Sequence, residues 1–367
     1  MNIFLVGNGF DLAHGLPTDY MSFVKFLNIV QIGVTWGENH NAIREDMKQF
    51  QICPEFDSFF LDYFSSLPND RNIYIEEVQD LMQDNFWTTY FLPAANRKNT
   101  WINFESEISR IIQALDRYIN TTDKSERLDK LSLIAPIFGR VNITKDEITR
   151  KGFEKLRDRL LADLDNLIRC LEIYLCLCLE IVPVNKQLSS VAQIGYVDKV
   201  LSFNYTNTFE KTYFLPHKET YLISYGKFPE YCYIHGRAHK NSSGSNNMVL
   251  GIDEYLSEPE RSKNVEFLHF KKFYQRIFKQ TDYNFVDWLK GPGEKRLYII
   301  GHSLDKTDGD VLRDMLTSPH METTIYYHTK DANAQQISNL LNILGYDELN
   351  ALTRGQKDSS ITFKLLG

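Results

Sequence analysis

The chain has 367 residues, a length that suggests about two units of roughly 150 residues each, or one core with a large insertion. Apolar residues make up 43% of the chain, enough to bury a substantial core, and the formal net charge of -7 argues against a general nucleic-acid binder, which needs clustered Lys and Arg. The five cysteines include no CxxC pair, which argues against a disulfide framework or a structural zinc site and fits a reducing cytoplasm.

The first predicted element is a buried strand. Residues 2–6 form a continuous apolar run that ends in Gly7-Asn8-Gly9. Such a run predicts a strand covered on both faces, as in a parallel sheet. The same segment has no basic region and no small-residue cleavage site, so it is not a signal peptide. Apolar residues at helical spacing follow in residues 19–32.

The middle of the chain, roughly residues 40–190, predicts a mostly helical section. Helical periodicity is clearest in residues 101–118 and 155–181. The longest apolar stretch, residues 167–184, is interrupted by three charged residues, so it predicts a buried helix and not a membrane span. We therefore expect a cytoplasmic protein with no membrane partner.

Strand-like runs return late in the chain and alternate with helical segments. The runs are 196–203, 231–234, 248–252, 296–300 and 323–328, and the helical segments are 262–289 and 333–344. This order of elements predicts an open parallel sheet with a large insertion, because one strand is followed by a long helical section and then by several strand–helix units. We place the sheet domain in residues 1–20, 195–255 and 293–367, a large helical insertion in 21–194 and a smaller one in 256–292.

The turn Gly7-Asn8-Gly9 is a candidate phosphate site. Because glycine lacks a Cβ, backbone N–H groups can approach a ligand closely, and a helix that begins there adds free N–H groups and a positive dipole end. An ordinary turn is the alternative. A second glycine with a proline, Gly15-Leu16-Pro17, follows six residues later and favours the phosphate site.

Polar and glycine residues also follow the later predicted strands. They are Asn204–Tyr205, His235–Gly236 and Gly301–His302–Ser303. In open parallel sheets, ligands bind beside the carboxyl ends of the strands, so we expect one crevice to collect these residues. Taken singly, Asn204, His235 and His302 could each be an ordinary turn residue.

Val6–Thr18 (VGNGFDLAHGLPT) resembles the opening of the AbiH family of bacterial abortive-infection proteins. It is also similar to the N-terminal signature of sirtuins, in which a strand is followed by GxGxS, a short helix and G-I-P. Further segments resemble strand ends of sirtuin-like NAD-cleaving domains, namely Ser202–Thr206, Tyr233–Gly236, Val249–Gly251 and Gly301–Leu304 with Asp308, and Trp101–Glu105 is similar to an AbiH element. The resemblance implies an α/β fold with a Rossmann-like (sirtuin-like) parallel sheet and a large helical insertion.

The same resemblance implies an NAD site without a metal. Asn204 would hold the nicotinamide ribose or position a water molecule, and His235 would act as general base. Asp308 or Asp310 would contact the adenosine ribose, unless Asp308 caps the helix that begins there. The other cofactor contacts would come from Gly7, Asn8, Gly9, Phe10, Asp11, Gly15, Gly301, His302 and Ser303.

Two residues depart from the sirtuin signature, which has serines where this chain has Asp11 and His14. A carboxylate beside a diphosphate is repulsive unless it points away, caps a helix or binds a cation. Asp11 therefore favours a changed ligand or binding without turnover. The paired CxxC zinc module of sirtuin deacetylases is also absent, which argues against protein deacetylation.

These features leave an enzyme and a binding module open. The enzyme would be an NAD glycohydrolase (NAD+ nucleosidase), or a related nucleotide-processing enzyme, that acts in antiphage defence by depleting a nucleotide. The binding module would sense NAD, ADP-ribose or another nucleotide and act through a partner or a second copy of the chain, and a phage-derived molecule would be the trigger. A nuclease-like toxin is the weakest hypothesis, and a local basic cluster (Lys271, Lys272, Arg276 and Lys279) is the one candidate nucleic-acid surface.

Overall fold

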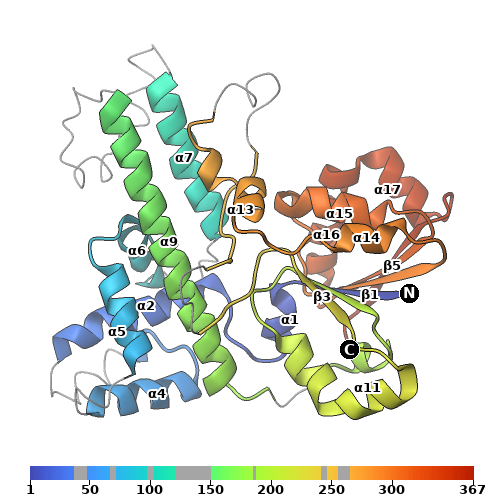
Figure 1. Cartoon of the computed structure of the whole chain (residues 1–367), viewed down its shortest axis with the longest axis horizontal. Helices are drawn as coiled ribbons and strands as arrows, with labels where there is room; N and C mark the ends of the chain where they lie inside the picture. The colour runs from blue at the N-terminus through green and yellow to red at the C-terminus, as the bar shows by residue number, and fades with distance from the viewer. Residues whose placement is uncertain are drawn as a thin grey trace. The chain divides into compact units, whose positions relative to one another are not determined.

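The computed structural model describes residues 1–36, 48–66, 72–96, 103–120, 150–184, 187–240, 246–254 and 265–367. The chain forms two compact units, shown together in Figure 1. Unit 1 comprises Met1–Thr18, Cys178–Ala238 and Thr281–Gly367, and unit 2 comprises Asp19–Leu177 and His239–Gln280. Trp101 and Ile102, which belong to the predicted helix 101–118 and to the segment similar to AbiH proteins, lie outside the described residues.

Unit 1 is built on a six-stranded sheet in which all neighbouring strands are parallel. The strands are β1 (Asn2–Val6), β2 (Lys199–Ser202), β3 (Glu230–Tyr233), β4 (Lys295–Ile300), β5 (Met321–Tyr327) and β6 (Ser360–Leu365). Their order across the sheet is β3-β2-β1-β4-β5-β6. The predicted α/β fold with a parallel sheet is confirmed.

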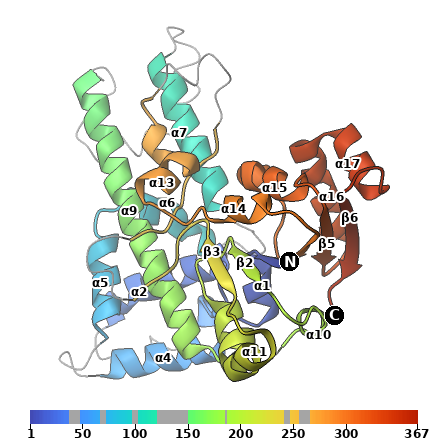
Figure 2. The same cartoon turned by 45° about the vertical axis from the view of Figure 1, so that its right-hand side comes forward.

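Helices cover both faces of the sheet, which explains why β1 is a continuous apolar run. Ile3 and Leu5 point into one core and Phe4 and Val6 into the other, because successive side chains of a strand alternate between faces. The first core is completed by α14 (Phe285–Lys290), α15 (Gly309–Leu316), α16 (Lys330–Leu344) and α17 (Tyr346–Thr353). The second is completed by α1 (Asn8–Ala13), α10 (Ser189–Ala192) and the π-helical turn η3 (Glu210–Phe214). Figure 2 shows α16 and α17 beside β5 and β6.

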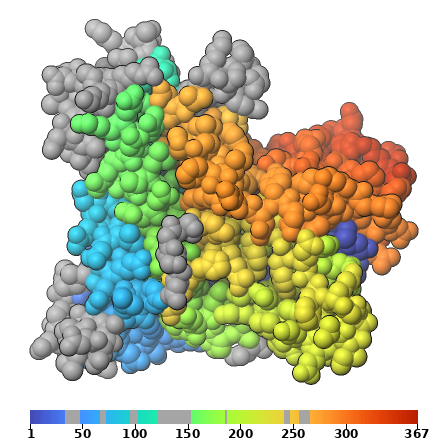
Figure 3. All heavy atoms as spheres, viewed as in Figure 1, coloured from blue at the N-terminus to red at the C-terminus, as the bar shows by residue number. Residues whose placement is uncertain are grey.

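One helical segment of unit 1 lies at the surface (Figure 3). It consists of η4 (Leu215–His217) and α11 (Lys218–Tyr225). Tyr221 is the buried residue of α11, and its ring packs against Phe214 and Tyr196. Leu222 and Ile223 are exposed, so this helix contributes little to the core.

The predicted strand 248–252 is wrong. Residues 248–252 are extended but belong to unit 2, and they make one isolated bridge, between Ile252 and Lys271. The backbone of Ile252 exchanges hydrogen bonds with Phe270 and Lys272, and a Cβ on Gly251 would lie 2.7 Å from the Phe270 oxygen. The segment is therefore apolar because it packs in a helical unit, where its polar backbone groups pair with a loop and not with a sheet.

Unit 2 is helical in its described residues, as predicted for most of this section. Its helices are α2 (Tyr20–Trp36), α4 (Pro54–Ser65), α5 (Ile73–Met82), α6 (Phe86–Phe91), α7 (Phe104–Asn120), α9 (Arg150–Ile181, of which residues to Leu177 belong to this unit) and α13 (Lys272–Phe278), with the 3-10 turns η2 (Leu92–Asn96) and η5 (Leu268–Phe270). Aromatic rings fill its core: Phe104 stacks between Tyr20 and Phe91, with ring centroids 4.5 and 3.9 Å away. In the described ranges, no helix is both long enough and apolar enough to cross a membrane.

The basic cluster around Lys271 is buried and paired. The Lys271 ammonium lies 2.8 Å from both carboxylate oxygens of Glu254, and the Lys272 ammonium lies 2.9 Å from Glu105. Both lysines are buried, and Lys279 pairs with Asp165. Buried and neutralised cations do not form a surface for nucleic acid. This cluster therefore does not form the local basic patch that the sequence left possible.

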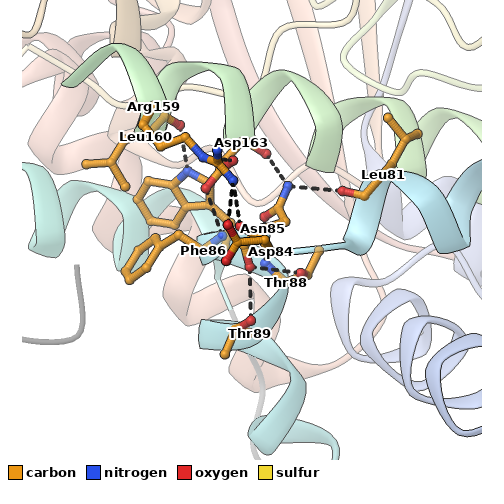
Figure 4. Close-up of polar contacts among 10 residues, drawn as sticks. Leu81, Asp84, Asn85, Phe86, Thr88, Thr89, Arg159, Leu160 and Asp163 are labelled. Atoms are coloured by element: carbon orange, nitrogen blue, oxygen red, sulfur yellow. Dashed lines mark hydrogen bonds and ion pairs between the residues drawn. The ribbon is translucent and has the colours of Figure 1, made fainter. Parts of the chain in front are cut away.

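A buried polar network fastens α6 to α9 in unit 2 (Figure 4). Asn85 caps α6, because its side-chain oxygen accepts the Thr88 N–H at 3.1 Å, and its Nδ2 donates to the backbone oxygen of Asp163 at 2.8 Å. The Asp163 carboxylate in turn accepts the N–H of Phe86 at 2.8 Å. The Trp87 indole donates to Leu160 at 2.9 Å. Each of these buried polar groups therefore has a partner on the other helix or in the cap.

We expect Asn85→Ala to lower the free energy of unfolding of unit 2 by about 2–4 kcal/mol, since it removes a helix cap and a buried hydrogen bond to the Asp163 backbone oxygen. Asn72→Ala is the matched control, because Asn72 caps α5 from a partly exposed position. Its cost should be about 1 kcal/mol. Urea titrations of both variants measure the difference, and equal costs would show that the second contact of Asn85 contributes nothing.

Candidate functional site

The predicted site residues follow the carboxyl ends of the first four strands of unit 1. β1 leads into Gly7, β2 into Phe203 and Asn204, β3 into His235, and β4 into Gly301. The strand order reverses between β1 and β4, and ligands of open α/β sheets bind outside the carboxyl ends of strands at such a point. The structure thus brings residues predicted from four separate segments to one edge of the sheet.

The first glycine turn offers fewer free N–H groups than the sequence suggests. The N–H of Gly7 donates to Ile300 at 3.1 Å, that of Gly9 to Gly301 at 2.8 Å, and that of Phe10 to Gly7 at 2.8 Å. Three amide groups that were expected to face a phosphate are therefore bound to backbone carbonyls. A phosphate would have to displace these bonds or be held by other groups.

Close packing of two backbone turns accounts for the glycines at positions 7, 9 and 301. A Cβ on Gly7 would lie 2.7 Å from the Gly301 oxygen, and one on Gly9 would lie 2.9 Å from the Gly301 Cα. Gly301 has a φ of +72°, and its Cβ would lie 2.0 Å from the nitrogen of Phe10. These glycines are required by the contact between the turn after β1 and the turn after β4, independently of any ligand.

Phe10, which lies on α1, and His14, which follows the end of this helix, belong to the core. The Phe10 ring is fully buried and packs against Phe4 and Tyr213. The Tyr213 hydroxyl accepts the N–H of Leu188, so it donates its own proton to His14 Nε2 at 2.8 Å. His14 then carries its proton on Nδ1 and donates it to the Phe10 oxygen at 2.6 Å. Both ring nitrogens of His14 are therefore engaged in structural hydrogen bonds.

Asp308 lies between two histidines. Its Oδ1 is 3.0 Å from His235 Nε2, and its Oδ2 is 3.6 Å from His302 Nε2. Both histidines are buried, and the ring of Phe203 packs edge-on against each of them. Asp308 occupies the N-cap position of α15, as the alternative interpretation expected, but its side chain makes no capping hydrogen bond and pairs with the histidines instead.

The loop after β4 fixes the proton of His302. The backbone N–H of Leu304 donates to His302 Nδ1 at 2.9 Å, so this nitrogen carries a lone pair and the ring proton resides on Nε2, toward Asp308. Leu304 is fully buried with a φ of 57°, which is rare for leucine and persists only where the surroundings impose it. Gln336 Nε2 also donates to the His302 oxygen, at 3.0 Å. His302 is therefore held rigidly beside Asp308.

Asp11 faces a second polar group, which follows β2. Thr206 donates its hydroxyl proton to Asp11 Oδ2, and Thr208 donates to Thr206 at 3.2 Å. Asp11 is 1% exposed. Gly7 occupies the N-cap of α1, and Asp11 lies within the helix, so the suggestion that Asp11 caps it is wrong.

Polar atoms without partners surround a small cavity beside Asp11. Among the described residues, Asp11 Oδ1, both amide atoms of Asn204 and the Tyr231 hydroxyl have no hydrogen-bond partner. These three residues line a cavity of about 10 Å³. In folded proteins such groups usually pair with a protein atom or with an ordered water.

Burial raises the pKa of the Asp11 carboxyl to about 6, because an ionised carboxylate loses its hydration there. The hydrogen bond from Thr206 and the nearby Thr208 hydroxyl offset part of this increase. The Asn204 amide also lowers the pKa by its proximity, although its geometry does not reach a well-formed hydrogen bond. A carboxyl group that titrates near neutral pH in such a place is a candidate for proton transfer.

Asn204 and His235 belong to neighbouring polar groups and not to one pair. The Ser202 hydroxyl fixes the turn at Asn204. It donates to the backbone oxygen of Asn204 at 2.9 Å and accepts the backbone N–H of Asn204 at 3.2 Å. The Asn204 amide then lines the cavity of Asp11, whereas His235 pairs with Asp308. Phe203, the neighbour of Asn204 in the chain, contacts the His235 ring and so joins the two groups.

Three other predicted cofactor residues are exposed. Asn8 is exposed, and its side-chain oxygen accepts the Thr18 hydroxyl at 2.7 Å. Gly15 and Ser303 are also exposed. Thr206, Thr208, Tyr231 and Gln336 contribute to the site although their sequence context did not predict it. Hydroxyls at alternate positions after a strand end, as in Asn204-Tyr205-Thr206-Asn207-Thr208, are the signal that could have identified the two threonines. In the part of the chain that the structure describes, no three His, Cys, Asp or Glu side chains are placed to hold a metal.

A protein family matches most of this chain. The model of the family described as bacteriophage abortive infection AbiH matches residues 3–328. Neither a curated protein nor a solved structure gives a significant match. The matched range includes both glycine turns, Asn204 and the pair of His235 with Asp308, and it confirms the resemblance seen in Val6–Thr18. The chain therefore belongs to the AbiH family of bacteriophage abortive infection proteins.

Proposed function

We propose that this protein is an NAD glycohydrolase of antiphage defence, which cleaves the bond between nicotinamide and ribose and depletes NAD in the cytoplasm. The observation that supports it best is the meeting of Asn204 and the Asp308-paired His235 at the carboxyl edge of a parallel sheet. The strand order of this sheet is that of Rossmann-like, dinucleotide-binding folds. Membership of an abortive-infection family supports the biological role.

The chemistry requires a cation-like transition state and a base. Nicotinamide leaves as a neutral ring and takes the electron pair of the C1′–N bond, and the ribose becomes oxocarbenium-like, as in glycoside cleavage. Asp308 accepts the Nε2 proton of His235, so Nδ1 carries the lone pair that can take a proton from a ribose hydroxyl. In this proposal Asp308 orients His235 and does not bind the adenosine ribose, a role that passes to the exposed Asp310.

The diphosphate needs donors other than the N–H groups of Gly7, Gly9 and Phe10, because these are bound to carbonyls. Asn8 and Ser303 are the exposed polar side chains of the two glycine turns, and we assign the diphosphate contact to them. Phe10, which is in the core, would contribute no side-chain contact to the ligand.

Nucleotide sensing without turnover is the second function, and both functions face the same restriction. The cavity beside Asn204 has a volume of about 10 Å³, whereas nucleotide-sized ligands occupy pockets of several hundred Å³. NAD therefore needs a rearrangement of this edge before it can enter. A phage-derived trigger or a second copy of the chain would supply that rearrangement in either function.

The test measures nicotinamide release from NAD by the purified protein, and NAD loss in cells that express it during phage infection. Asn204→Ala and His235→Ala should each reduce release by roughly 100-fold or more, as expected for groups of a catalytic centre. Asp308→Asn should act in the same direction by losing the orientation of His235. His328→Ala, which changes an exposed histidine after β5, is the control. Tight NAD binding without release, in both settings, would support the sensor instead.

A further inference from the structure

The polar atoms around the Asp11 cavity come from three separate parts of unit 1. Asp11 lies on α1, Asn204 follows β2 and Tyr231 lies on β3. Asp11 and Asn204 are 1% and 5% exposed, and Asp11 Oδ1, the Asn204 amide and the Tyr231 hydroxyl have no partner among the described residues. Polar groups that are buried away from bulk water and have no hydrogen-bond partner destabilise the folded state.

The cavity between them matches one water molecule. Its volume of about 10 Å³ is near the smallest space that admits a single water, and a buried water needs two to four polar partners. Asp11 Oδ1 can accept a proton from it, and the Asn204 amide and the Tyr231 hydroxyl can donate to it or accept from it. The Thr206 hydroxyl occupies Asp11 Oδ2, so the other oxygen remains for the cavity.

We propose that this pocket binds one water molecule and that this water is the nucleophile of the proposed NAD hydrolysis, with Asp11 as the group that takes its proton. The role of this water as the nucleophile rests on the proposed function. The water oxygen bonds to C1′ as the C1′–N bond breaks, the electron pair of that bond goes to the nicotinamide nitrogen, and the water proton goes to Asp11 Oδ1. The raised pKa of Asp11 supports this role, because a carboxylate destabilised by burial is a stronger proton acceptor.

The test of the reaction compares two processes that both break the C1′–N bond, hydrolysis and exchange of the base. NAD alone reports hydrolysis, whereas NAD with 3-acetylpyridine reports exchange of the base, which breaks the C1′–N bond without water. Asp11→Asn should reduce hydrolysis by roughly 100-fold and exchange by far less, and it should abolish the loss of hydrolysis on acidification through about pH 6. Asp287→Asn, at an exposed ion pair, is the control. An equal loss of both reactions, or no loss, would overturn the role of Asp11.

A crystal structure of the wild-type protein tests the site without any activity. Density for one water within hydrogen-bond distance of Asp11 Oδ1 and the Asn204 amide is the expected result. An empty cavity, or a metal ion in it, would overturn the water site. Absence of nicotinamide release by the wild-type protein, in vitro and during infection, would instead refute the proposed function and with it the nucleophile role, and the crystal structure would still decide the site.

Discussion

Gly301→Ala is expected to unfold unit 1 or to lower its free energy of unfolding by roughly 4 kcal/mol or more. Gly301 has a φ of +72°, and the new Cβ would lie 2.0 Å from the Phe10 nitrogen and 2.5 Å from the Gly9 carbonyl carbon. Backbone atoms cannot move aside as a flexible side chain can, so the turns after β1 and β4 would have to separate. Urea titration and the yield of soluble protein measure the effect.

Gly15→Ala is the matched control for this substitution. Gly15 has a similar φ of +82°, but a Cβ there would meet nothing within 4 Å. Its cost should therefore be the left-handed strain alone, about 1–2 kcal/mol. Equal stability of the two variants would show that the turns after β1 and β4 do not touch as described, and the account of the glycines at positions 7 and 9 would fail with it.

The strands β1 to β5 could be predicted because they are mostly buried and therefore contain short apolar runs. One predicted run contains β2, and three others cover most of β3, β4 and β5, with ends shifted by one or two residues. The same signal failed for residues 248–252, since an apolar extended segment in a helical unit has the composition of a strand. It also missed β6, whose edge position leaves Thr362, Lys364 and Leu365 less buried.

The helical segment 262–289 illustrates a different limit. Its described part contains η5, α13 and α14 as separate short helices, and the last of these belongs to unit 1. Periodicity finds apolar faces, but it does not show which core a face enters. The boundary at Thr281 follows from long-range packing, which the order of residues in one segment does not contain.

The candidate site could be located from sequence, whereas its pairings could not. Strand ends placed Asn204, His235 and Gly301 at one edge because parallel strands share a direction. The bridging of two histidines by Asp308 depends on a leucine held at positive φ, and the environment of Asp11 depends on Thr206 from another segment. Both are long-range contacts whose residues look ordinary in the sequence. The bonded state of the glycine N–H groups likewise depends on the turn after β4.

Asp11→Asn is expected to be more stable than the wild-type protein at neutral pH and to lose this advantage at acidic pH. The pKa of Asp11 is raised from 3.8 to about 6, so the folded state holds its proton more tightly than the unfolded state. The contribution to stability is fully present below about pH 4, falls as the pH rises through 6, and is then absent; the difference is on the order of 3 kcal/mol. Asparagine does not titrate, so this fall should be missing in the variant.

Thermal or urea unfolding between pH 4.5 and 7.5 measures this dependence, with Asp287→Asn as the control at an exposed carboxylate. The free-energy gap between Asp11→Asn and wild type should grow toward neutral pH in favour of the variant, and the control should track wild type. A gap that does not change with pH would contradict the raised pKa. When the ionised Asp11 destabilises the fold and asparagine at the same position does not, the carboxylate serves a role other than stability. The expected loss of hydrolysis in the same variant would identify that contribution as proton transfer.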